Sequence, residues 1–114
     1  MASPPSNVAF SPAVKAVQAA RGSRAIYARA ELPGNEWPRA IDDDLAAFLA
    51  EQTTCFLASA SADGQPYIQH RGGPPGFLRV LDGHRIAWAD FRGNRQYVTT
   101  GNLSENPRVC LFLI

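Results

Sequence analysis

Apolar residues near the start of the chain repeat at helical spacing and predict a short helix that ends at Gly22. Val14 and Val17 fall on one face of this segment. It begins at Ser11 followed by a proline, residues that favour the N-cap and the first helical position. Gly22 supplies a stop. The neighbouring segments are expected to form a disordered or arm-like start, a second short helix and a loop, at residues 1–10, 23–30 and 32–38.

A second amphipathic pattern predicts a better helix beside a run of three aspartates. Its apolar residues recur at helical spacing, at Ile41, Leu45, Phe48 and Leu49. The aspartates at residues 42–44 lie at the helix start, where carboxylates cap free backbone N–H groups and favour the positive end of the helix dipole. Three consecutive acids at a helix start cannot converge on one ion, so we expect capping and no metal site.

From Thr53 onward the pattern changes to short apolar runs separated by turn residues, which predicts strands. The expected strands span residues 55–61, 67–71, 77–81, 84–89 and 108–114, with a short helix at residues 93–102. The first two strands flank a hairpin loop at residues 62–66, and the next two flank Asp82-Gly83, a dipeptide typical of two-residue hairpin turns. Hairpins without crossover helices favour a small antiparallel barrel over a doubly wound sheet. We therefore expect a mainly β fold, a β-barrel with a few helices.

The C-terminal strand ends on Ile114 without a turn, a charge or a polar tail. Because such a run leaves an exposed apolar edge, we expect the chain to be truncated at its C-terminus, with further strands missing. Cys55 and Cys110 lie in apolar runs and are expected to be buried, reduced thiols. The expected organisation is an N-terminal helical arm, residues 1–40, followed by a partial barrel domain, residues 41–114.

The composition of the chain excludes several functional classes. The 114 residues are 46% hydrophobic and 18% charged with a net charge of +1, values typical of one small globular domain. A charge so near neutral argues against nucleic-acid and membrane-surface partners. No apolar stretch is long enough to cross a bilayer, and the N-terminus lacks the features of a secretion signal. We expect a cytoplasmic protein.

Positive charge is concentrated in residues 69–102, where five arginines face two aspartates and leave a net charge of +3. The planar guanidinium group of arginine suits phosphate, and a helix starting near Gly93 would add unpaired backbone N–H groups. Arg95 would lie one turn into that helix, and Arg71 on a neighbouring strand would supply a second grip. The alternatives are a solvated arginine-rich surface and an ion pair of Arg95 with a nearby acid.

Short motifs follow one another in a fixed order along the second half of the chain. They are Asp63-Gly64-x-Pro66, a strand ending in Arg71, the bend Gly72-Gly73-Pro74-Pro75-Gly76, Phe77-Leu78-x-Val80-Leu81, Ala89-Asp90-x-x-Gly93-Asn94-Arg95-Gln96, Gly101-Asn102-Leu103 and Asn106-Pro107-Arg108-Val109. In this order they resemble the pyridoxamine 5′-phosphate oxidase-like family of FMN-binding split β-barrels. Near the N-terminus, Phe10-x-Pro12-x-Val14-Lys15-x-Val17-Gln18 and Gly22-Ser23-Arg24 are similar to one flavoprotein subgroup of that family.

The resemblance implies a homodimer with FMN at the subunit interface. By position, the cofactor-binding residues that it implies are Gln69, Arg71, Trp88, Ala89, Asp90, Asn94, Arg95 and Gln96. The basic residues and Asn94 would bind the phosphate, the two glutamines the ribityl chain or ring edge, and residues 88–90 would run beside the flavin ring. The founding oxidases carry a Ser-Arg-Lys-type motif where this chain has Gly-Asn-Arg-Gln. Vitamin B6 oxidation is therefore not implied.

The expected activity is that of an FMN-dependent oxidoreductase with an unassigned small-molecule substrate or electron donor. In such proteins the cofactor carries the electrons while the protein binds and orients it, so no catalytic residue stands out. His70 and His84 lack the partners of a hydrolase triad. One alternative is a non-catalytic protein that binds flavin, haem or a deazaflavin. Another is a barrel that binds single-stranded nucleic acid, against which the inward positions of the aromatic residues argue.

Overall fold

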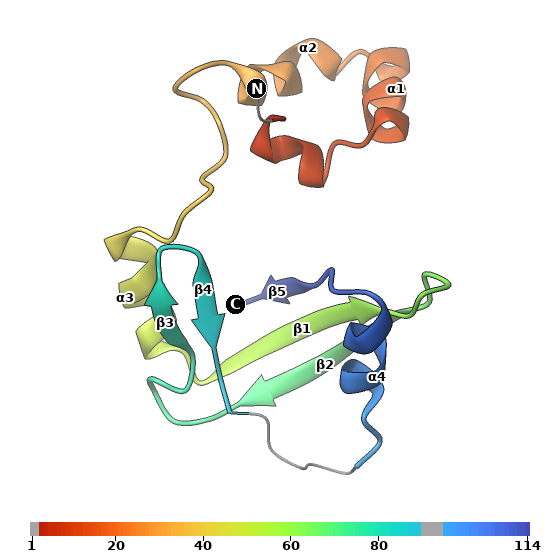
Figure 1. Cartoon of the computed structure of the whole chain (residues 1–114). Coiled ribbons are helices and arrows are strands. Elements are labelled where there is room, and N and C mark those ends of the chain that lie inside the picture. Colours follow the sequence, from red (N-terminus) through yellow and green to blue (C-terminus); the bar gives the residue numbers. More distant parts are fainter. Residues whose placement is uncertain (1–2, 90–94) are drawn as a thin grey trace. The chain divides into compact units, whose positions relative to one another are not determined.

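The computed structural model describes residues 3–89 and 95–114 (Figure 1). The chain divides into two compact units, Met1–Ile41 and Asp42–Ile114, and each is described here by itself. No helix in the described part of the chain has both the length and the apolar character needed to span a membrane.

The first unit is built from short helices. They are the 3₁₀ helix η1 (Pro5–Val8), α1 (Pro12–Arg21), α2 (Arg24–Tyr27) and the 3₁₀ helix η2 (Ala28–Glu31). The expected caps of α1 are confirmed, because the Ser11 side chain accepts a hydrogen bond from the Val14 backbone N–H at 3.2 Å. At its other end Gly22 has φ 85°, in the left-handed region that glycine adopts without steric cost.

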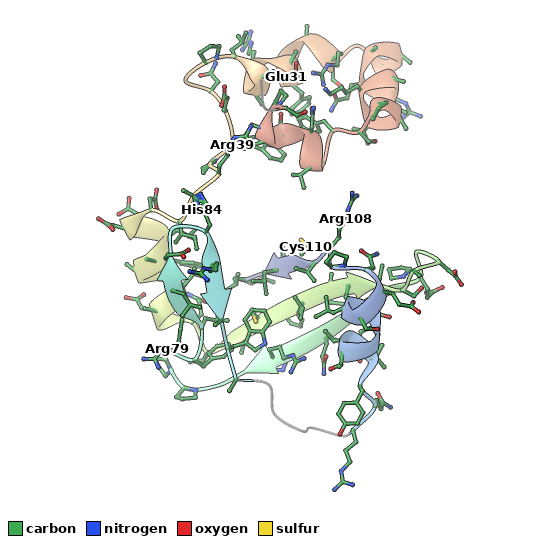
Figure 2. The ribbon with its side chains drawn as sticks, in the orientation of Figure 1. Glu31, Arg39, Arg79, His84, Arg108 and Cys110 are labelled. Carbon is green, nitrogen blue, oxygen red and sulfur yellow. The ribbon has the colours of Figure 1, made fainter. Side chains whose placement is uncertain are left out.

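Aromatic and ionic contacts hold these helices together. The ring of Phe10 packs edge-on against Tyr27 and Trp37, with centroids 5.8 and 5.2 Å away. Lys15 and Arg24 both contact the carboxylate of Glu31, labelled in Figure 2, and the hydrogen bond from Lys15 is the largest cause that lowers the pKa of this carboxyl. Within the segment expected to be a disordered or arm-like start, Pro5–Val8 form η1, and Phe10 packs in this cluster.

The described residues of the second unit form two helices and two small antiparallel sheets. The larger sheet has the order β2-β1-β5 and is formed by β1 (Thr54–Ala60), β2 (Pro66–Gly72) and β5 (Cys110–Phe112). The smaller is the hairpin of β3 (Arg79–Asp82) and β4 (Arg85–Ala87), and the helices are α3 (Asp43–Glu51) and α4 (Val98–Glu105). The antiparallel hairpins are confirmed, but the fold is mixed rather than mainly β, and the described strands do not close a barrel.

The expected capping at the start of α3 is confirmed for Asp42. The Asp42 carboxylate accepts a hydrogen bond from the Leu45 backbone N–H at 2.8 Å, and the two acids that follow lie in the first helical turn. Leu49 is buried at 2% exposure. Among the described residues no group of acids, histidines or cysteines is placed to hold a metal ion.

One face of the larger sheet forms the core of the second unit. Along β1 the buried residues alternate, at Cys55, Leu57 and Ser59. Directly opposite them on β2 lie the half-buried residues Arg71, Gln69 and Tyr67. Because paired residues of an antiparallel sheet point to the same face, these six side chains share one side, against which α4 packs (Figure 1).

The turn of the second hairpin differs from the expected one by one residue. Asp82 pairs with Arg85, so Gly83 and His84 form the two-residue turn rather than Asp82 and Gly83. The Asp82 carboxylate accepts hydrogen bonds from the His84 backbone N–H at 2.8 Å and from Arg85 Nε at 2.7 Å. The bond from Arg85 is the main cause that lowers the pKa of Asp82. The Asp82 carboxylate thus stabilises the turn through these two hydrogen bonds.

The helix expected at residues 93–102 begins later. Arg95 and Tyr97 have φ values of 62° and 55°, and such left-handed residues cannot belong to a right-handed helix. The helix α4 therefore starts at Val98 and runs to Glu105. The sequence suggested that Arg95 lies one turn into this helix, but Arg95 precedes it. Gly93 lies outside the described residues.

The C-terminal strand is shorter and more exposed than expected. It covers Cys110–Phe112 and, among the described strands, pairs with β1 alone, at the edge of the sheet. Phe112 is 55% exposed, and Cys110 is exposed rather than buried (Figure 2). Cys55, on the central strand, is fully buried as expected. The two thiols differ because Cys110 lies on an edge strand, opposite Ala58, whereas Cys55 lies on the central strand, on the other face of the sheet.

Candidate functional site

A pocket of about 350 Å³ is lined by the end of β2, the bend that follows it, and residues at and just after the end of β4. In Figure 1 the segment that follows β4 runs down toward the arrowhead of β2. Two arginines and two aromatic residues contribute to its lining, at Arg71, Arg79, Phe77 and Trp88. Glycines, Pro74 and two alanines complete the described lining, which contains no acidic residue. The pocket therefore combines positive charge with apolar surface.

The glycine- and proline-rich bend forms one wall of this pocket. The Phe77 backbone N–H donates to the Pro74 carbonyl at 3.0 Å, and Gly76 adopts φ 88° within that turn. A Cβ on Gly73 would lie 2.7 Å from the Cβ of Phe77, closer than side chains tolerate. The bend can thus hold the phenyl ring against the backbone of Gly73 because that residue has no side chain.

The charge of Arg71 lies close to the buried face of the sheet. Arg71 is half-buried and pairs directly with Cys55 across β1 and β2. Burial raises the pKa of the Cys55 thiol, and the positive charge of Arg71 partly opposes this rise. Because a guanidinium in such a position is only partly hydrated, its attraction for an anion is stronger than that of a fully solvated arginine.

The structure brings together three of the residues that the resemblance implied. Arg71, Trp88 and Ala89 all line the pocket, the first from β2 and the others from the end of β4. Gln69 lies on the same face of β2, where its Oε1 accepts a hydrogen bond from the Thr99 hydroxyl at 2.6 Å.

The remaining implied residues lie outside the pocket lining or outside the described residues. Arg95 and Gln96 precede α4, are exposed and are not among the residues that line the pocket. Asp90 and Asn94 lie outside the described residues. His70, which was not assigned a role, points to the opposite face of β2 and packs against Phe56 with ring centroids 5.5 Å apart.

Sequence reasoning missed several residues at and near the pocket. Phe77 and Arg79 were assigned no role at a binding site, although both line the pocket. Phe77 and Arg79 are two residues apart at the start of a strand, so their side chains point to the same face. That spacing is the sequence signal that could have indicated that they lie together. Thr99 had no such signal, because its partner Gln69 is thirty positions away in the sequence.

Comparison with known proteins gives one positive result. A family model described as Pyridoxamine 5'-phosphate oxidase matches residues 41–114, more than half of the chain. The match includes every residue that lines the pocket. No curated protein and no solved structure matches the chain.

Proposed function

The chain belongs to the pyridoxamine 5'-phosphate oxidase family, and from this premise we propose that it binds FMN and acts as an FMN-dependent oxidoreductase. The observation that carries the proposal is the meeting of Arg71, Trp88 and Ala89 in one pocket. FMN joins a doubly charged phosphate to a flat, largely apolar ring system. A pocket with arginines, aromatic walls and no acid in its described lining suits a ligand of that kind.

Each part of the cofactor has a candidate partner in this proposal. The guanidinium of Arg71 binds phosphate oxygens, and the strand end at Trp88 and Ala89 runs beside the ring. Asn94, Arg95 and Gln96 supply further polar groups to the phosphate and ribityl chain, and Asp90 extends the ring-side strand. When bound, the flavin supplies hydride or electron transfer, while the protein supplies binding, orientation and shelter from water.

We infer that the working protein is a homodimer with the cofactor at the interface. The proposal rests on the family, and it accounts for a pocket that one chain surrounds incompletely. A split barrel completed by two chains would also account for strands that do not close on themselves here. The substrate and the electron donor are small molecules that these residues do not identify.

We propose a cytoplasmic location, where both cysteines would stay reduced. Cys55 and Cys110 are both free thiols, and free thiols persist in a reducing compartment. Cys110, on the exposed edge strand, would be open to oxidation elsewhere.

The absorption spectrum of the purified protein tests the proposal. We expect flavin bands and about one FMN per chain, and bleaching of these bands when a reduced nicotinamide or another donor is added, followed by recovery in air. A flavin that stays bound but never bleaches would identify a non-catalytic carrier. A Soret band would identify haem, and a deazaflavin spectrum a different cofactor. Failure to retain or bind FMN would overturn the proposal.

Replacing Gly73 with alanine should narrow the pocket. The added Cβ would meet Phe77 at 2.7 Å and push the ring away from the bend. We expect about a tenfold weaker affinity for FMN, the scale of about 1.4 kcal/mol, measured by fluorescence titration. Gly83→Ala is the matched control, because a Cβ there meets nothing within 4 Å. Equal affinities of the two variants would show that Phe77 does not shape the binding site.

A further inference from the structure

Three side-chain hydrogen bonds fix α4 on the larger sheet. They join Thr99 Oγ1 to Gln69 Oε1 at 2.6 Å, Asn102 Nδ2 to Ser59 Oγ at 3.0 Å, and Asn106 Nδ2 to the Ser61 carbonyl at 3.5 Å. The three helix-side residues recur at spacings of three and four, so they lie on one side of α4 and its C-cap. Thr99 and Ser59 are each only 5% exposed.

The bond between Thr99 and Gln69 differs from the other two in what it connects. Thr99 lies in the first turn of α4, directly after the segment that contains Arg95 and Gln96. Gln69 lies on β2, two residues before Arg71 and on the same face. Alternate residues of a strand are about 7 Å apart. This bond therefore ties the segment before α4 to the strand that carries Arg71, whereas the bond from Asn102 reaches β1.

The backbone before α4 has a conformation that needs support. Arg95 and Tyr97 both adopt positive φ, and the N-cap Tyr97 makes no side-chain capping hydrogen bond. Non-glycine residues remain in this region only where surrounding contacts hold them. The buried hydroxyl of Thr99, two residues after Tyr97, provides one such contact with the sheet.

We propose that Gln69 and Thr99 form a positioning pair. By holding the segment before α4 near the strand that carries Arg71, the pair lets Arg95 and Gln96 bind the same phosphate monoester as Arg71. The inference rests on the proposed function, because the phosphate is that of FMN. It also changes the role of Gln69. Its side-chain oxygen acts through Thr99, rather than by touching the ribityl chain or the ring edge.

The test compares variants that remove the same kind of bond at two places. Thr99→Val keeps the shape of the side chain and loses the hydroxyl, Thr99→Ser keeps the hydroxyl, and Ser59→Ala removes the partner of Asn102. Affinities for FMN and for riboflavin, which lacks the phosphate, are measured by fluorescence quenching alongside thermal melting. Gln69→Met removes the acceptor from the other side and serves if Thr99→Val does not fold.

We expect Thr99→Val and Gln69→Met to weaken FMN binding about tenfold while riboflavin affinity changes less than twofold. Thr99→Ser should restore FMN binding to within twofold of the unmodified protein. Ser59→Ala should lower the melting temperature without changing the preference for FMN over riboflavin.

The results that would contradict the positioning role differ from the result that would contradict the proposed function. If the unmodified protein binds FMN but Thr99→Val weakens FMN and riboflavin equally, or acts no differently from Ser59→Ala, the pair is structural and the inference is wrong. If the unmodified protein binds neither ligand, the proposed function itself fails and the inference with it.

Discussion

Arg71→Ala is expected to weaken FMN binding by about 10- to 100-fold. A hydrogen bond between charged groups contributes about 1.5–3 kcal/mol, and each 1.4 kcal/mol is a factor of ten in affinity. Arg71 lines the pocket, and its positive charge partly opposes the rise that burial causes in the pKa of the Cys55 thiol. Arg71→Lys keeps the charge without the paired donors of arginine, so its affinity should be intermediate. Equilibrium titration with FMN measures the Kd of the unmodified protein and of the two Arg71 variants.

Two further arginine variants make this prediction specific. Arg95→Ala tests the contribution of the segment before α4. The double variant Arg71→Ala and Arg95→Ala should release flavin on dialysis. Arg108→Ala is the control, because Arg108 is exposed, precedes β5 and is not part of the pocket lining (Figure 2). It removes the same charge and should leave the Kd within twofold. A double variant that stays yellow after extensive dialysis would refute the assignment of the phosphate to these arginines.

Leu57→Ala is expected to cost about 2–5 kcal/mol of unfolding free energy, the range for buried leucines cut back to alanine. Leu57 is 2% exposed, lies on the central strand of the larger sheet and pairs with Gln69 on one side and Leu111 on the other. The cavity would open beneath α4, beside the residues that position the site. For a chain of this size the loss should lower the melting temperature by roughly 10 °C or more.

Ile68→Ala is the matched control for the core substitution. Ile68 is 61% exposed on the opposite face of β2, so its truncation should cost less than about 1 kcal/mol. Denaturant unfolding gives both values. Similar losses for the two variants would contradict the assignment of the core to one face, and would show that the other face is covered in the assembled protein.

Short-range signals predicted the parts of the fold that depend on neighbouring residues. The caps of α1 and α3 formed as expected, because Ser11 and Asp42 bond to backbone groups three residues away. The hairpin of β1 and β2 and the glycine-rich bend also arise from residues adjacent in the sequence. The cationic segment was recognised in the same way, since its charge can be counted without knowing where it folds.

Longer-range contacts decided where those elements go and which side chains meet. The start of α4 moved because Arg95 and Tyr97 take left-handed conformations that no propensity scale assigns to them. Cys110 is exposed on β5, which within the described part of the chain is an edge strand of the larger sheet. Amino-acid order alone indicated a family, a set of caps and a basic segment that suits phosphate. Only the tertiary structure placed Arg71 beside Trp88 and joined Gln69 to Thr99, because hydrogen bonds and packing between distant segments depend on how the sheet is assembled.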